Sequence, residues 1–333
     1  MLLLAGCTAA GNDRSSTVRT APLRRDEIVL AVDHHQHFAS AGTVGMLNSR
    51  MPPGAARLEP ITAERVIALL DEAGIRRAVV LSGAFTFGGR SFDPERSTLS
   101  PAELTARVRA ENEWTLSEVA RYPTRLTAFC SFHPQAESAM AELRWCADQS
   151  GFVGVKLHLE ESDVDLTNES HAVAVRRIFA EANRLRMPIV IHPRNNRVDA
   201  VATTEAFLTR ILPAAPDVPV QIAHLHGGGM YSEAALKLYA DAVSSGNPAT
   251  RNLLFDVTDV IRTSPKGGAD ASVIEGMVAL MRRIGMERML YGSDPAVMGR
   301  LAPREGWAEF KRVMPLTDEE IARIAANVAP YLR

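Results

Sequence analysis

Hydrophobic residues along this chain fall into eight short runs, separated by amphipathic stretches and polar loops. Each run is apolar at nearly every position, which is typical of strands in a parallel sheet whose outer face is covered. The runs predict strands at 28–38, 77–82, 126–132, 152–158, 188–193, 218–224, 253–257 and 288–294.

Helical spacing of apolar residues follows almost every run. It predicts helices at 62–73, 100–121, 136–149, 170–185, 202–212, 232–244 and 272–283, and two terminal helices at 304–311 and 317–327. Eight alternating units predict an α/β fold, the TIM (β/α)8 barrel, with 25–333 as a single domain. A doubly wound open sheet is the competing fold, but it needs a Gly-rich phosphate loop where this chain has His35-Gln36-His37.

Composition narrows the class of protein. The chain has 333 residues, 46% of them hydrophobic, and a formal charge of -2, which gives no argument for nucleic acid or for a charged membrane surface. Its three cysteines are Cys7, Cys130 and Cys146. Cys130 lies in an apolar run and Cys146 in a helical stretch, so both are predicted as small core residues without a disulfide framework or a cysteine zinc site.

The chain begins with a short apolar stretch that ends at Cys7. Leu4-Ala5-Gly6-Cys7 resembles a bacterial lipobox, in which the cysteine is lipidated after signal cleavage, and 1–24 would then be a signal remnant and flexible tether. The stretch lacks a basic segment, and its apolar part is short for a signal peptide. Either translation starts upstream or the likeness is accidental. The first case predicts a cell-envelope protein, lipid-anchored or periplasmic, and the second a cytoplasmic one.

The first candidate site residues lie at the end of the first predicted strand, in Asp33-His34-His35-Gln36-His37. Side chains alternate along a strand, so His35 and His37 leave the same face about 7 Å apart along the chain. Two imidazoles in this arrangement can bind one metal ion without any distortion of the backbone.

Polar residues gather at or just past the carboxyl ends of the predicted strands. They are His35, His37, His133, Lys156, His158, His192, His224, His226 and Asp294. Barrel enzymes place their chemistry on the rim formed by the carboxyl ends of the strands. The clustering therefore predicts an active site on this rim.

Four motifs in order make the chain similar to a known group of proteins. They are Asp33-x-His35-x-His37, His192-Pro193, Ala223-His224-Leu225 and Tyr291-Gly292-Ser293-Asp294-Pro295. Together they resemble the amidohydrolase superfamily. More narrowly, they resemble its amidohydrolase-related branch, which holds aminocarboxymuconate-semialdehyde and resorcylate decarboxylases, pyrone-dicarboxylate lactonases and oxalomesaconate hydratases.

The resemblance implies a barrel of the metal-dependent hydrolase type with one divalent ion held by His35, His37, His192 and Asp294. Zn²⁺ is the first expectation and Mn²⁺ the second, since imidazole and carboxylate ligands suit both. His224 and Asp294 would be the catalytic acid/base residues. His226, two residues on, stays open as the working imidazole instead of His224.

Other rim residues are expected to contact substrate. Lys156 would bind a substrate carboxylate or pair with a neighbouring acid, although some superfamily members carry a carboxylated, metal-bridging lysine near this position. His158 shares its face and joins the pocket wall, and Arg194 either clamps an anionic substrate or is a solvated loop residue. Asp33 is expected to orient a ligand imidazole, and Asp256 to support the rim or cap a loop. The segments 39–60, 83–100 and 159–169 should form the pocket mouth.

The function expected first is hydrolysis of an ester, lactone or amide bond of a small anionic substrate by a metal-activated water. The alternative is metal-dependent, non-oxidative decarboxylation of an aromatic or unsaturated carboxylic acid. A non-catalytic envelope binding protein is a third interpretation, which the intact ligand set argues against. The partners expected are a small molecule and, through Cys7 alone, a membrane lipid, and the sequence leaves a homodimer open.

Overall fold

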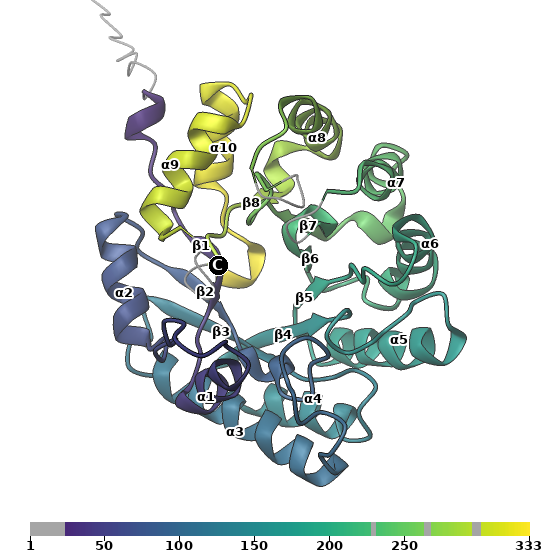
Figure 1. Ribbon diagram of the computed structural model, residues 1–333. Helices are drawn as coiled ribbons and strands as arrows, with labels where there is room; N and C mark the ends of the chain where they lie inside the picture. The colour runs from purple at the N-terminus through teal and green to yellow at the C-terminus, as the bar shows by residue number, and fades with distance from the viewer. Residues whose placement is uncertain (1–23, 228–230, 263–267, 295–300) are drawn as a thin grey trace, which may run out of the picture.

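The structure, a computed structural model, describes residues 24–227, 231–262, 268–294 and 301–333. Within these ranges eight parallel strands lie side by side in chain order. They are β1 (Asp33–His37), β2 (Ala78–Leu81), β3 (Leu126–Ser131), β4 (Phe152–His158), β5 (Ile189–His192), β6 (Val220–Ile222), β7 (Leu253–Asp256) and β8 (Met289–Leu290). Figure 1 shows the strands around a common centre with the helices outside them. The predicted TIM barrel is confirmed.

Backbone hydrogen bonds close the barrel between its last and first strands. The His34 amide donates to the Tyr291 carbonyl at 2.9 Å, and the Asp294 amide donates to the His35 carbonyl at 2.8 Å. Both partners of β1 lie just after β8 in the chain. This closure brings Asp294 beside the histidines of β1.

Ten α-helices surround the sheet in the described residues. They are α1 (Ala41–Ser49), α2 (Ala63–Glu72), α3 (Pro101–Val119), α4 (Ala139–Asp148), α5 (Glu169–Arg184), α6 (Ala200–Ala206), α7 (Glu233–Ser244), α8 (Ala271–Ile284), α9 (Pro303–Val313) and α10 (Asp318–Ala326). Ser100 begins α3 as predicted: its side chain accepts from the Glu103 amide at 3.3 Å, and Glu103 accepts from the Ser100 amide at 2.8 Å. None of these described helices has the length and apolar character needed to cross a membrane.

Three local predictions differ from the structure. The apolar run from Ile28 is not strand until Asp33; instead, the Ile28 carbonyl accepts from the Trp307 indole of α9 at 2.8 Å. Helix α1 lies inside the segment predicted as the loop 39–60, and Ser40 caps it by accepting from the Thr43 amide. Strand β6 ends at Ile222, before His224. Burial alone made the first run resemble a longer strand, because an apolar segment packed on a helix has the same pattern.

The two core cysteines form a disulfide bond, which corrects the prediction of free thiols. Cys130 of β3 and Cys146 of α4 are bonded, with their Cα atoms 6.2 Å apart, and both are fully buried. The bond joins a strand to the helix that follows it. Sequence spacing did not indicate it because pairing depends on which faces of β3 and α4 meet in space. Cys7 lies outside the described residues.

The C-terminal segment fills the amino end of the barrel, opposite the predicted rim. Leu332 packs with Val79 and Phe129 inside the barrel, and its carbonyl accepts from Arg77, which precedes β2, at 3.1 Å. The ring of Tyr331 meets the ring of Phe129 edge to face at a centroid distance of 5.1 Å. Figure 1 accordingly places the C-terminus at the centre of the strands. The barrel interior is thus a packed core below the site.

Candidate metal and active site

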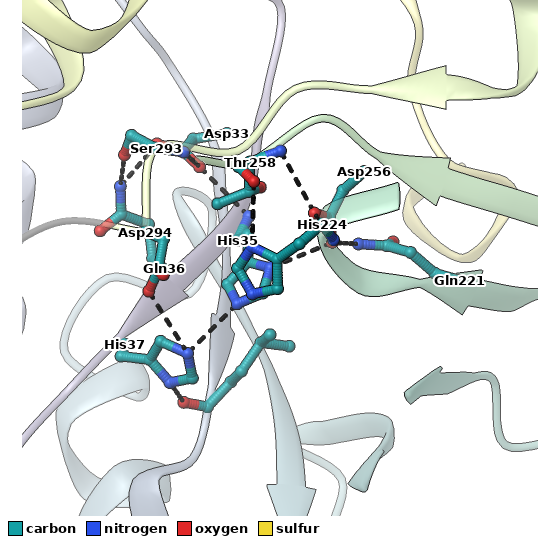
Figure 2. Close-up of polar contacts among 11 residues, drawn as sticks. Asp33, His35, Gln36, His37, Gln221, His224, Asp256, Thr258, Ser293 and Asp294 are labelled. Carbon is teal, nitrogen blue, oxygen red and sulfur yellow. Dashed lines mark hydrogen bonds and ion pairs between the residues drawn. The ribbon is translucent and has the colours of Figure 1, made fainter. Parts of the chain in front are cut away.

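Two imidazoles of β1 and a carboxylate beyond β8 face the same space at the carboxyl end of the barrel. The Nε2 atoms of His35 and His37 lie 3.2 Å apart, and His37 Nε2 lies 3.6 Å from Asp294 Oδ1. His224, after β6, joins them: ligand atoms of His35, His224 and Asp294 all lie within 4.8 Å of one another. Figure 2 shows the three histidines and Asp294 converging.

The hydrogen bonds of the three imidazoles determine which nitrogen faces this space. His35 Nδ1 donates to Asp256 Oδ2 at 3.0 Å, His37 Nδ1 to the Leu81 carbonyl at 2.8 Å, and His224 Nδ1 to the Thr258 carbonyl at 2.9 Å. Carbonyl and carboxylate oxygens only accept, so each Nδ1 carries a proton, and in the neutral imidazole the Nε2 then carries the lone pair.

In their neutral forms His35 and His37 direct two lone pairs at each other across 3.2 Å, and two lone pairs cannot hydrogen-bond to one another. They can share one cation, which is the arrangement of two imidazole ligands. Burial lowers the pKa of His37 to about 3 and that of His224 to about 4, so both imidazoles are neutral near pH 7. Neutral imidazole is the form that binds metal.

His192 ends β5 on the same side of the barrel. Its ring centroid lies 5.2 Å from that of His224 and 4.1 Å from that of His158. Its Nε2 atom is buried and has no hydrogen-bond partner among the described residues. A buried polar nitrogen without a partner is costly, and a metal ion would satisfy it. Imidazole nitrogens with one carboxylate therefore fit a divalent ion such as Zn²⁺ or Mn²⁺.

Two of the site's side chains, those of His224 and Asp294, are carried by residues with a strained backbone conformation. His224, Leu225 and His226 have φ values of 55°, 48° and 72°, and Asp294 has a φ of 44°. Non-glycine residues in this region cost about 1–3 kcal/mol each and collect at functional sites. The His224 amide is held by Asp256 Oδ1 at 2.8 Å, which fixes the turn that carries the imidazole. His224 thus reaches the site from a turn and not from the predicted strand end.

The structure distinguishes the two histidines of this turn. His224 lines the cavity described below, whereas His226 is buried elsewhere, with its Nδ1 3.2 Å from the Tyr239 hydroxyl. A ligand atom of His224 also lies within 4.8 Å of ligand atoms of His35 and Asp294, although the sequence assigned it to acid/base work alone. The geometry allows either role for His224 and places His226 outside the cavity.

Asp256, not Asp33, orients a ligand imidazole, which corrects the expected role of Asp33. The Asp33 carboxylate instead accepts from Ser293 Oγ at 2.6 Å and from the His35 amide at 3.2 Å, joining the two backbone segments that carry His35 and Asp294. Burial raises the pKa of Asp33. Burial would also raise the pKa of Asp256, but the neighbouring His35 and the hydrogen bonds it receives hold that pKa well below its ordinary value.

A cavity of about 340 Å³ opens onto the histidine cluster. Its polar end is lined by His35, His37, Lys156, His192, His224 and Asp294. Its apolar wall is formed by Phe38, Ala39, Leu47, Phe85 and Phe92. The ring of Phe85 stacks on His158 at a centroid distance of 4.8 Å. The cavity thus places an apolar wall beside a polar end that holds Lys156 and the candidate metal ligands.

Three predicted substrate contacts have different outcomes. Lys156 and His158 both line the cavity, and burial lowers the pKa of Lys156 to about 8 against the opposing effect of the Asp256 and Asp294 carboxylates. Arg194 donates to the Gly227 carbonyl and is not among the described residues that line the cavity, so its role as a clamp stays a prediction.

Phe85 and Phe92 line the cavity from the segment 83–100, which was expected at the pocket mouth. Two further parts of the site were not expected from sequence. Arg262 lines the cavity from a segment after β7, where residue spacing carries no signal. Gln221 contacts Asp256 from the barrel interior. A polar residue in the apolar run of β6 was the available clue, because a buried amide needs partners.

A parallel barrel with imidazoles and a carboxylate at its carboxyl rim defines a class of proteins, the metal-site TIM barrels. A family model described as Amidohydrolase matches residues 32–329, and the chain therefore belongs to this family and is an enzyme of its superfamily. The comparison with curated protein sequences gave no match.

Solved structures with the same fold include 5-carboxyvanillate decarboxylase from Novosphingobium aromaticivorans with bound manganese (14% identity, 91% of this chain and 97% of that chain, TM-score 0.61). Another is 2,6-dihydroxybenzoate decarboxylase from Rhizobium (16% identity, 89% and 96%, TM-score 0.58). A third is a probable 2-pyrone-4,6-dicarboxylic acid hydrolase from Acinetobacter baumannii (16% identity, 89% and 96%, TM-score 0.52). At these identities the likeness establishes the fold.

Proposed function

We propose that this protein is a metal-dependent decarboxylase of an aromatic or unsaturated carboxylic acid. The observation that carries the proposal is the cavity, in which an apolar wall of phenylalanines faces a cluster of unprotonated imidazole nitrogens and a buried lysine. A flat carboxylic acid fits this division, with its ring on the wall and its carboxylate beside Lys156 and the proposed metal ion. Decarboxylases among the solved structures with this fold support the choice over the hydrolysis expected first from sequence.

The metal ion would be held by His35, His37, His192 and Asp294, with His224 beside it. The bound ion would supply Lewis-acid polarisation of the substrate oxygens. Neutral His224, through its free Nε2, would accept a proton from a substrate hydroxyl next to the carboxylate. Lys156 would balance the charge of the carboxylate before it leaves.

Asp294 would deliver the proton on which the reaction depends. In its protonated form it would give this proton to the carbon that bears the carboxylate, so that a new C–H bond forms. The bond from that carbon to the carboxyl group then breaks, its electron pair returns to the ring, and carbon dioxide leaves. His224 would then return its proton to the product hydroxyl oxygen, a proton from solvent would restore Asp294 for the next turnover, and the reaction needs no oxidant or reductant.

The direct test is a panel of substrates incubated with the metal-loaded enzyme. It contains 2,6-dihydroxybenzoate, 5-carboxyvanillate, related hydroxybenzoates and 2-pyrone-4,6-dicarboxylic acid. The proposal predicts carbon dioxide release from at least one aromatic acid. Ring opening of the lactone, with no carbon dioxide from any acid, would replace the proposal by the hydrolase interpretation, which needs the same metal with a water in place of the carboxylate.

Lys156 gives the reaction an expected pH dependence. With its pKa lowered to about 8, the lysine is an ammonium below that pH and loses its charge above it. KM for a carboxylate substrate should therefore rise as the pH increases through about 8. Lys156→Met should raise KM at pH 7 by about 10-fold or more, the scale of one lost charged hydrogen bond, and should flatten the rise. A wild-type KM that is constant from pH 7 to 9 would contradict this role.

We also propose that the protein matures in an oxidising compartment of the cell envelope, with Cys7 as its lipid attachment site. The buried Cys130–Cys146 disulfide supports this proposal, because such bonds persist in exported proteins and are rare in the reducing cytosol. Mass spectrometry of protein from its native host, alkylated under denaturing conditions without reduction, should find Cys130 and Cys146 unalkylated and Cys7 acylated. Alkylated Cys130 and Cys146 would count against the compartment, and an unmodified Cys7 against the anchor.

A further inference from the structure

A chain of hydrogen bonds runs from the amino end of the barrel to the candidate metal site. The Tyr331 hydroxyl donates to Gln221 Oε1 at 2.5 Å, and Gln221 Nε2 donates to Asp256 Oδ2 at 2.9 Å. His35 Nδ1 donates to the same Asp256 oxygen at 3.0 Å. The last two links are drawn in Figure 2. One continuous path therefore connects the C-terminal segment with the imidazole whose other nitrogen faces the metal site.

The direction of each link follows from the chemistry of the groups. Asp256 already accepts from the His224 amide and from His35, so its carboxylate requires the amide nitrogen of Gln221 to face it. This requirement turns Gln221 Oε1 toward Tyr331, and only a donor satisfies that oxygen. The phenol hydroxyl is such a donor. It therefore holds the amide in the one orientation that supports Asp256.

The orientation of the Gln221 amide is important because water cannot replace a lost hydrogen-bond partner at this buried position. Gln221 and Asp256 have no exposed surface, and His35 is 1% exposed. Without the tyrosine hydroxyl, Gln221 Oε1 would be buried without a partner. The amide could then rotate and present its oxygen to the Asp256 carboxylate, which would weaken the acceptor that fixes the His35 tautomer.

We propose that Tyr331 is a positioning residue for the metal: through Gln221 and Asp256 it holds His35 in the orientation and tautomer that bind the ion. The proposal rests on the metal site proposed above and is independent of the reaction. It gives the C-terminal segment a second role beside filling the barrel. Groups that support a ligand in this way typically change metal affinity by about 10–100-fold.

The test uses Tyr331→Phe, which keeps the ring packed on Phe129 and removes the hydroxyl alone. Metal affinity is measured on the metal-loaded protein by competition with a chromophoric chelator, for Zn²⁺ and for Mn²⁺. We expect the dissociation constant to rise about 10-fold, at the lower end of the range for such supporting groups. Tyr122→Phe is the matched control, because the Tyr122 ring lies against the guanidinium of Arg121 away from the site. Its dissociation constant should match that of the wild type.

A second variant separates positioning from general destabilisation. Gln221→Met breaks the path one step nearer the metal and should weaken binding at least as much as Tyr331→Phe. If Tyr331 acts through Gln221, the double variant binds no more weakly than Gln221→Met alone. A purely structural role would lower the melting temperature and leave the dissociation constants unchanged. Equal affinity in wild type and Tyr331→Phe, or additive effects in the double variant, would overturn this inference, whereas a wild type that binds no metal would overturn the metal site itself.

Discussion

Replacing Asp294 by Asn should lower kcat by about 10³-fold or more, because the Asp294 carboxylate is proposed both to bind the ion and to donate the proton. Losing a general acid alone typically costs about 10²–10⁴-fold. The amide keeps the size of the carboxylate but has no acidic proton and is a weaker ligand. Its position is strained, with a φ of 44°, and asparagine tolerates this region as well as aspartate does. The fold should therefore survive, and kcat with the best substrate of the panel is the measurement.

The control for Asp294→Asn is Asp318→Asn. Asp318 begins α10 and pairs with Arg25 at 2.7 Å on the surface, outside the cavity. Its amide variant should retain wild-type kcat. If Asp294→Asn retained more than a tenth of wild-type kcat, the proton would have to come from another group, with His224 the next candidate in the cavity.

His37→Ala should remove the metal as well as the activity. This imidazole is held by the Leu81 carbonyl at 2.8 Å and points its Nε2 at His35 and Asp294, so its loss removes one of the expected metal ligands. We expect bound metal to fall below about a tenth of the wild-type content, and activity to fall with it, because an ion with fewer protein ligands dissociates far more readily.

His171→Ala is the matched control for His37→Ala. His171 lies on α5, where its Nδ1 accepts from the Asp165 amide at 3.1 Å, away from the described cavity lining. Its variant should keep both metal and activity. A His37→Ala protein that retained full metal content would show that the ion is held by the other imidazoles of the cluster.

The barrel and the location of its site were predictable because both depend on local patterns. Each strand of a closed parallel sheet is buried on both sides, so its apolar run stands out against the amphipathic helices. Polar residues at the ends of such runs, such as His37 and His192, must gather on one rim because all the strands point the same way. The chain order of the strands then followed from their regular alternation with helices.

The supporting contacts could not be predicted, because they join residues far apart in the chain. His35 and Asp256 are separated by 221 positions, and Gln221 and Tyr331 by 110. No spacing rule indicates that Asp256, rather than Asp33, holds the imidazole. The left-handed backbone at His224 was also missed, since a non-glycine residue gives no sequence signal for a positive φ.

The proposed function depends most on the cluster of imidazoles and Asp294 being a metal site, and elemental analysis of the purified protein tests this directly. After reconstitution with Zn²⁺ or Mn²⁺ and removal of free ions, we expect about one divalent ion per chain, lost on exposure to a strong chelator and regained with activity. A folded protein that carries no divalent metal after reconstitution would contradict it.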